Sequence, residues 1–144
     1  MMIKRAGVVM AGMALVISAC SSSEPVASPS SSIAAEPATD LTVTASEFTY
    51  DTTNLAVPAG EEISIHFTNA GTIPHEWAVL KKGVRIATNE QFREDMVLFE
   101  VEAQTEGTTT TQTFVLETAG EYQFICALEG HFASGMHGTV TAVA

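Results

Sequence analysis

Alternation of apolar and polar residues, with a period of two, limits what this 144-residue chain can fold into more than any other feature. In residues 63–67, the apolar side chains Ile63, Ile65 and Phe67 stand on one side of an extended chain, and polar residues stand on the other. Similar alternation occurs in residues 41–45, 97–102, 122–126 and 139–143. Because successive side chains of a strand point to opposite faces, this pattern predicts strands that each bury one face.

Turn signals separate these segments, at Pro58-Ala59-Gly60, at Lys81-Lys82-Gly83 and at Ala119-Gly120. Seven to eight short strands over residues 41–144 predict an all-β fold, a Greek-key β-sandwich or barrel. Residues 89–95 are charged and do not alternate. We therefore expect a small helical turn or loop excursion around residues 88–96, followed by a strand where alternation resumes.

The first 19 residues have the pattern of an export signal. Lys4 and Arg5 precede an uncharged apolar run, residues 6–17, which is too short to span a bilayer but has the length of a signal-peptide core. The run leads into Ile17-Ser18-Ala19-Cys20, which resembles the bacterial lipobox. The resemblance implies a lipoprotein signal peptide over residues 1–19 and lipidation of Cys20. The alternative is an ordinary cleaved signal followed by a chance cysteine.

Residues 20–40 are predicted to be the lipidated N-terminus and a disordered tether. Residues 21–40 contain seven Ser, four Ala and three Pro, a composition that cannot bury enough apolar surface to offset the entropy of ordering. The folded domain is then 41–144. Without Lys4 and Arg5, four cationic residues face 17 acidic ones, and the formal net charge changes from -11 to -13. Such an acidic chain is not expected to bind nucleic acid.

Four side chains with metal-binding chemistry fall in a notable order. His75 is followed much later by Cys126, His131 and Met136, each separated from the next by four residues. A thiolate, two imidazoles and a thioether are the donors of trigonal blue-copper sites with a weak axial Met, whereas structural zinc sites do not use a thioether. A lone Cys or Met is usually a core residue. The joint spacing favours a copper site instead.

Three segments resemble the cupredoxins, small blue copper proteins of the plastocyanin, azurin and auracyanin type. They are residues 67–75, 120–126 and 135–141. The resemblance implies a cupredoxin domain over 41–144 that holds one type 1 copper ion. It implies that His75 and His131 are the equatorial imidazoles, Cys126 the thiolate and Met136 the axial thioether.

The resemblance also implies that His131 lies near the surface as the electron port, with Leu128, Phe132 and Ala133 as candidates for an apolar ring around it. The spacing from Cys126 to His131 is longer than in plastocyanin and closer to azurin and auracyanin. Plastocyanin has an Asn after its first His ligand, and that Asn braces the cysteine loop. This chain has Glu76 there, so the sequence does not predict the brace.

Other candidates have simpler interpretations. His66 lies opposite an apolar face and is expected to face solvent, His137 is expected to point away from Met136, and Trp77 is expected in the core. No orienting third group or oxyanion motif accompanies Cys126, so no enzyme activity is predicted. A relationship to copper oxidases or nitrite reductases is disfavoured, because no second ligand cluster is present in the sequence.

The sequence and the resemblance together predict a one-electron carrier at the outer face of a bacterial membrane. The expected partners are redox proteins, such as a c-type cytochrome or a membrane oxidoreductase, and the membrane itself through the lipid anchor. The protein is expected to be exported, to face the periplasm or cell exterior, and to be a monomer. The alternative is a copper-binding module for copper delivery or homeostasis.

Overall fold

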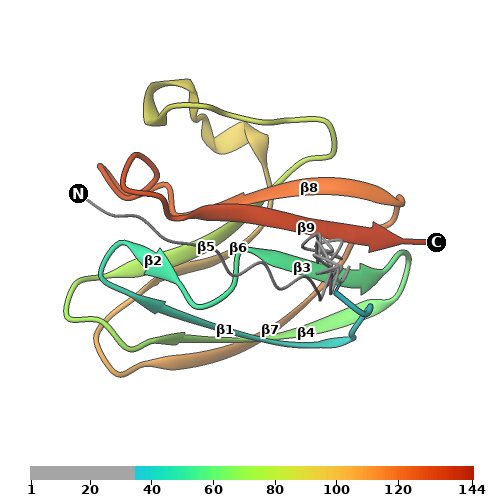
Figure 1. Ribbon diagram of the computed structural model, residues 1–144, viewed down its shortest axis with the longest axis horizontal. Coiled ribbons are helices and arrows are strands. Elements are labelled where there is room, and N and C mark those ends of the chain that lie inside the picture. Colours follow the sequence, from blue (N-terminus) through green and yellow to red (C-terminus); the bar gives the residue numbers. More distant parts are fainter. Residues whose placement is uncertain (1–34) are drawn as a thin grey trace, which may run out of the picture. The chain divides into compact units, whose positions relative to one another are not determined.

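A computed structural model describes residues 35–144, which form two β-sheets packed face to face (Figure 1). The strands are β1 (Asp40–Ser46), β2 (Thr49–Tyr50), β3 (Asn54–Pro58), β4 (Glu62–Asn69), β5 (His75–Leu80), β6 (Val97–Gln104), β7 (Thr109–Val115), β8 (Gly120–Ile125) and β9 (His137–Val143). The sheet orders are β2-β1-β4-β7 and β3-β9-β8-β5-β6. The predicted all-β sandwich is confirmed.

The strand count is nine within the described residues, against seven to eight predicted. The difference lies in residues 49–58, where two short strands join different sheets: β2 pairs with β1, and β3 pairs with β9. Two pairs are parallel, β1 with β4 and β3 with β9, and the others are antiparallel. Neighbours such as β3 and β9 are far apart in sequence, as in Greek-key folds.

The core between the sheets follows the alternation in the sequence. Ile63, Ile65 and Phe67 of β4 are fully buried, while the residues between them are partly exposed. Burying each of these side chains stabilises the folded state by about 1.5–3 kcal/mol. Trp77 of β5 is also fully buried and packs against Phe124 of β8 with a ring-centroid distance of 5.4 Å, as expected for a core residue.

Strand β5 is buried on both faces. Trp77 and Val79 face the main core, whereas Ala78 and Leu80 belong to a second apolar cluster. The second cluster is covered by the excursion between β5 and β6, which contains two short 3-10 helices, η1 (Asn89–Gln91) and η2 (Glu94–Met96). This confirms the helical excursion expected around residues 88–96.

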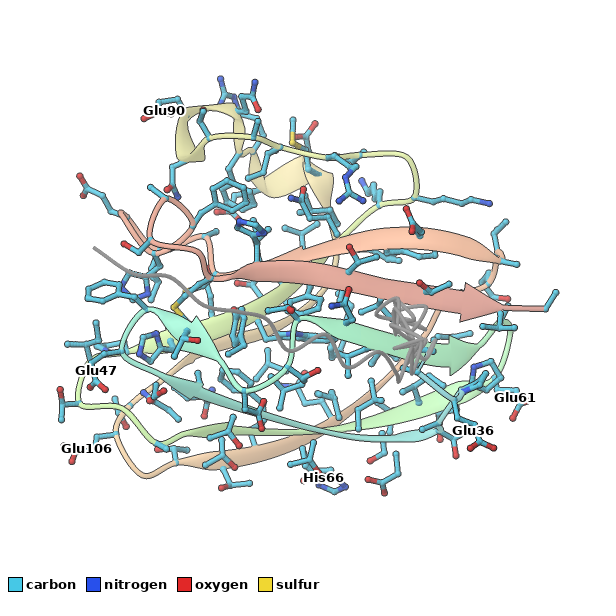
Figure 2. The ribbon with its side chains drawn as sticks, viewed as in Figure 1. Glu36, Glu47, Glu61, His66, Glu90 and Glu106 are labelled. Carbon is cyan, nitrogen blue, oxygen red and sulfur yellow. The ribbon has the colours of Figure 1, made fainter. Side chains whose placement is uncertain are left out.

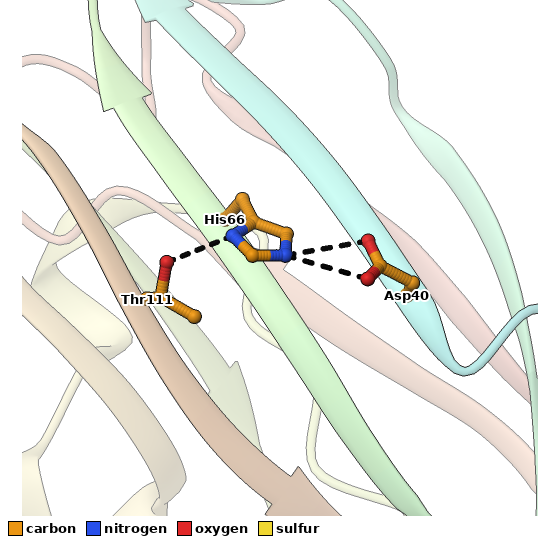
Figure 3. A network of polar contacts seen from close by, with 3 residues as sticks. All are labelled: Asp40, His66 and Thr111. Carbon is orange, nitrogen blue, oxygen red and sulfur yellow. Dashed lines mark hydrogen bonds and ion pairs between the residues drawn. The ribbon is translucent and has the colours of Figure 1, made fainter.

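His66 lies on the face of β4 that points away from the core (Figure 3). Its Nδ1 is 2.8 Å from the hydroxyl of Thr111 on β7, and its Nε2 is 3.4 Å from the carboxylate of Asp40 on β1. The side chain is 37% exposed. His66 therefore faces away from the core, as expected, and takes no part in the candidate metal site. Its links to β1 and β7 were not predicted.

The predicted signal peptide and Cys20 lie outside the described residues, as does most of the predicted tether. The described chain joins the fold slightly before residue 41, because the N–H of Ala38 donates to the carbonyl oxygen of Ala56 at 3.0 Å and β1 begins at Asp40. None of the helices in residues 35–144 has the length and apolar character needed to cross a membrane.

Candidate metal centre

Three of the four predicted ligands meet at one end of the sandwich. His75 is the first residue of β5, Cys126 directly follows β8, and His131 lies in the loop between β8 and β9. Because β5 and β8 are hydrogen-bonded neighbours, their ends bring residues that are distant in sequence together. One donor atom from each of the three side chains lies within 4.8 Å of the other two, and all three residues are buried.

The loop from Cys126 to Met136 closes on itself through backbone hydrogen bonds. The N–H of Cys126 donates to the carbonyl of Met136 at 3.0 Å, and the N–H of Met136 donates to the carbonyl of His131 at 3.1 Å. Gly130 and Gly135 have φ values of 81° and 109°, which non-glycine residues rarely adopt. These hydrogen bonds place the fourth predicted ligand, Met136, in the same closed loop, where it is fully buried.

Asn69 holds the segment that leads to His75, and sequence reasoning gave it no role. This fully buried side chain donates to the carbonyls of Ile73 and Gln104, both at 2.8 Å, and accepts the N–H of Gly71 at 2.8 Å. The available signal was an Asn at the end of a strand, followed two residues later by Gly, a combination typical of turns.

Glu76 joins the two parts of the site. Its Oε1 accepts a hydrogen bond from the backbone N–H of Ala127 at 2.6 Å, and the residue is 7% exposed. The hydroxyl of Tyr50 donates to the backbone carbonyl of Glu76 at 2.5 Å. A carboxylate thus braces the cysteine loop where the sequence did not predict a brace. The only sequence signal was a charged residue directly before the apolar run of residues 77–80.

Burial sets the protonation of these groups. Burial lowers the pKa of His131. Burial, followed by the charge of the neighbouring His131, also lowers the pKa of His75. Both imidazoles are therefore neutral at pH 7 and able to donate a lone pair. Burial raises the pKa of Cys126 to about 11 and also raises the pKa of Glu76. Without a metal ion, Cys126 is a thiol at neutral pH.

The donor atoms fit a copper ion. Nδ1 and Nε2 of His75 are both buried without a hydrogen-bond partner, which is costly unless something else satisfies them. Cys126 Sγ and His131 Nδ1 are 3.3 Å apart. A Cβ placed on Gly71 would be 3.1 Å from Nε2 of His75, so that nitrogen lies against Gly71 and Nδ1 is left for the cluster. Two imidazoles and one thiol match a single type 1 copper site.

The three residues expected to form an apolar ring around His131 differ in burial. Phe132 is only 5% exposed and belongs to the second apolar cluster, where its ring packs against the exposed His137 at a centroid distance of 4.7 Å. Leu128 is partly buried against the main core, and Ala133 is exposed. Sequence reasoning missed Phe48, whose ring contacts His131 from the turn between β1 and β2.

The chain is similar to copper-binding proteins in both sequence and fold. A family model described as copper binding proteins, plastocyanin/azurin family, matches residues 37–143. Reduced auracyanin from the photosynthetic bacterium Roseiflexus castenholzii has a TM-score of 0.68 and 24% identity, covering 76% of this chain and 100% of that chain. Auracyanin A of Chloroflexus aurantiacus, a blue copper protein, has a TM-score of 0.58 and 24% identity, covering 72% of this chain and 99% of that chain. Rusticyanin of Thiobacillus ferrooxidans has a TM-score of 0.59 and 18% identity, covering 74% of this chain and 79% of that chain. None of the curated protein sequences matches the chain.

Proposed function

Because the chain belongs to the plastocyanin/azurin family of copper-binding proteins, we propose that it carries single electrons between redox proteins and is not an enzyme. His75, Cys126, His131 and Met136 would hold one copper ion. The observation that carries the proposal is the buried cluster of His75, Cys126 and His131, with its donor atoms within 4.8 Å of one another. When bound, copper supplies a centre that alternates between Cu(II) and Cu(I).

The residues around the site would keep its geometry fixed during electron transfer. Backbone hydrogen bonds close the loop that carries Cys126, His131 and Met136, and Glu76 ties that loop to the strand that carries His75. Burial of the donors keeps water out. A site that changes little when its charge changes has little reorganisation to overcome, which favours a carrier over a protein that binds and releases copper.

The direct test is optical. The purified protein is expected to turn intensely blue with Cu(II), to bleach with a mild reductant and to recover its colour on oxidation. Cys126→Ser should abolish the colour, whereas His66→Ala should leave it intact because His66 is on the outer face of β4. A colourless complex that loses copper readily to a chelator would favour the alternative, copper delivery or homeostasis.

The distribution of charge supports a cationic redox partner, such as a c-type cytochrome. All four Lys and Arg residues of the described chain lie within residues 81–93, while acidic residues are spread along the rest of it. Figure 2 shows Glu47 and Glu106 at one end of the domain. Glu47 precedes Phe48, which contacts His131, so negative charge lies near the proposed electron port. The monomeric protein should react with a cationic cytochrome at a rate that falls as salt is added.

The location belongs to the same proposal. Residues 1–20 have the pattern of a lipoprotein signal, which supports export and attachment of the domain to the outer face of a bacterial membrane through Cys20. The test is fractionation of cells that produce the full chain. Cys20→Ala should either release the protein from the membrane fraction or leave it there as a larger, unprocessed precursor, and a protein of mature size that stays in the membrane fraction would contradict the lipid anchor.

A further inference from the structure

The turn between β1 and β2 consists of Glu47 and Phe48. Ser46 and Thr49 are paired across the hairpin, which leaves these two residues as the turn itself. Phe48 has a φ of 56°, and it is the one non-glycine residue with a positive φ in the part of the chain that the structure describes. Glycine would adopt this conformation without strain. A bulky aromatic residue in a strained turn indicates that the side chain has a role.

Phe48 lies against one of the two imidazoles. Its ring meets the ring of His131 edge to face, with a centroid distance of 5.2 Å and an interplanar angle of 74°. Phe48 is 43% exposed, whereas His131 is only 7% exposed. The phenyl ring therefore lies between this imidazole and solvent, on the side of the turn.

Glu47 is directed toward the other imidazole. Its Oε1 accepts hydrogen bonds from the backbone N–H and from the hydroxyl of Thr72, the latter at 2.8 Å. A Cβ added to Gly71 would be 3.0 Å from Oε1 of Glu47 and 3.1 Å from Nε2 of His75. Carboxylate and imidazole thus approach the same bare face of Gly71, and only a residue without a side chain leaves this space open.

We propose that the β1–β2 turn is an outer brace of the metal centre, in which Glu47 orients His75 and Phe48 shields His131. The inference rests on the proposed function and extends it to two residues outside the ligand set. Ligand histidines usually donate their second ring N–H to an outer acceptor, which fixes the tautomer and the ring orientation. Nε2 of His75 has no hydrogen-bond partner, and the carboxylate of Glu47 is the charged acceptor on that side.

The Glu47 half is tested by comparing Glu47→Ala with Glu106→Ala. Both remove an exposed carboxylate, and Figure 2 shows the two at the same end of the domain. Glu47→Ala should weaken Cu(II) affinity about tenfold in a chelator competition. Glu106→Ala should change it little. Glu47→Gln should restore part of the loss, because its amide oxygen can still accept from Thr72.

A copper-free measurement separates this inference from the proposed function. In the copper-free protein, ¹⁵N spectra should show His75 protonated at Nε2 in the wild type and in Glu106→Ala, and a mixture of tautomers in Glu47→Ala. If the wild type forms no reversible blue complex, the proposed function fails regardless of this result. If the wild type is blue and Glu47→Ala matches Glu106→Ala in affinity and in tautomer, only the role of Glu47 is overturned.

The Phe48 half is tested with Phe48→Gly and Phe48→Leu. Glycine relieves the positive φ, so the copper-free thermal midpoint should stay the same or rise. Copper should nevertheless leave Phe48→Gly severalfold faster in the presence of a chelator, because water reaches His131, while Phe48→Leu retains most of the cover. Equal release rates in the wild type and in Phe48→Gly would overturn the shielding role.

Discussion

The carboxylate of Glu76 accepts the backbone N–H of Ala127 at 2.6 Å, so the residue after His75 is bonded to the residue after Cys126. The contact fixes the separation of two predicted ligands, one at the start of β5 and the other directly after β8. Because both partners are at least partly buried, neither can readily exchange the other for water. The bond is therefore part of the scaffold of the site, and its removal should be measurable in the absence of copper.

Glu76→Ala should destabilise the copper-free protein by about 1–3 kcal/mol, because the N–H of Ala127 loses its partner. Glu76→Gln should destabilise the protein less than Glu76→Ala, since an amide oxygen can accept the same hydrogen bond and no charge is buried. Urea denaturation gives both values. The exposed Glu117→Ala is the control and should lie within about 0.5 kcal/mol of the wild type. Equal losses at positions 76 and 117 would contradict the brace.

Met136→Leu tests the fourth ligand. Leucine conserves the volume of this fully buried residue, so the copper-free protein should lose less than about 1.5 kcal/mol. Copper should still bind and give a blue colour, but with a higher reduction potential, because losing the weak axial donor and making the site more apolar disfavour Cu(II). The partly buried Met96→Leu is the matched control and should leave the potential unchanged. A potential unaffected by Met136→Leu would remove Met136 from the ligand set.

The parts of the structure that depend on local pattern could be predicted from the sequence. Alternation in residues 63–67 predicts the buried face of β4, and loss of alternation at residues 89–95 predicts the excursion. The spacing of Cys126, His131 and Met136 places them in one loop, because a turn follows directly after an apolar strand. Each of these inferences needs only neighbouring residues.

The remaining features depend on contacts between distant segments. A glutamate next to His75 is expected to be exposed, yet Glu76 is buried because β5 lies between two apolar clusters. Phe48 is a turn residue with no pattern to mark it, and its contact with His131 arises only when β1, β2 and the ligand loop meet at one end. The residues next to Glu76 and Phe48 in the sequence therefore indicate neither the burial of Glu76 nor the contact of Phe48 with His131.

Gly138→Ala should destabilise the fold by about 3 kcal/mol. Gly138 of β9 is paired with Phe124 of β8, and an added Cβ would overlap the Phe124 ring and the backbone carbonyl oxygen of Thr53. Backbone cannot move aside as a side chain can. Gly107→Ala is the comparison. Alanine at a φ of 72° should lower stability by about 1 kcal/mol, but its Cβ would meet open space. Thermal unfolding of the copper-free variants gives the order, and a Gly138 variant as stable as the Gly107 variant would contradict the close packing.

The pH dependence of stability should differ in sign between two glutamates. Partial burial, followed by the charges of Glu94 and Glu102, raises the pKa of Glu100 above its usual 4.5. The folded state then binds a proton more tightly than the unfolded state, so this residue lowers stability as pH rises from 4.5 through its folded pKa. Glu100→Gln should therefore be more stable than the wild type at pH 7, with the difference disappearing near pH 4.

Glu90 provides the opposite case in the same protein. The Thr88 hydroxyl, followed by a backbone hydrogen bond, lowers the pKa of Glu90. Its contribution to stability is present above pH 4.5 and is lost as pH falls through the lower folded pKa. Glu90→Gln should therefore be slightly less stable than the wild type at pH 7, with the difference again shrinking in acid. Urea denaturation of the copper-free protein between pH 3 and pH 7 measures both trends, and two variants that deviate from the wild type in the same direction would contradict these assignments.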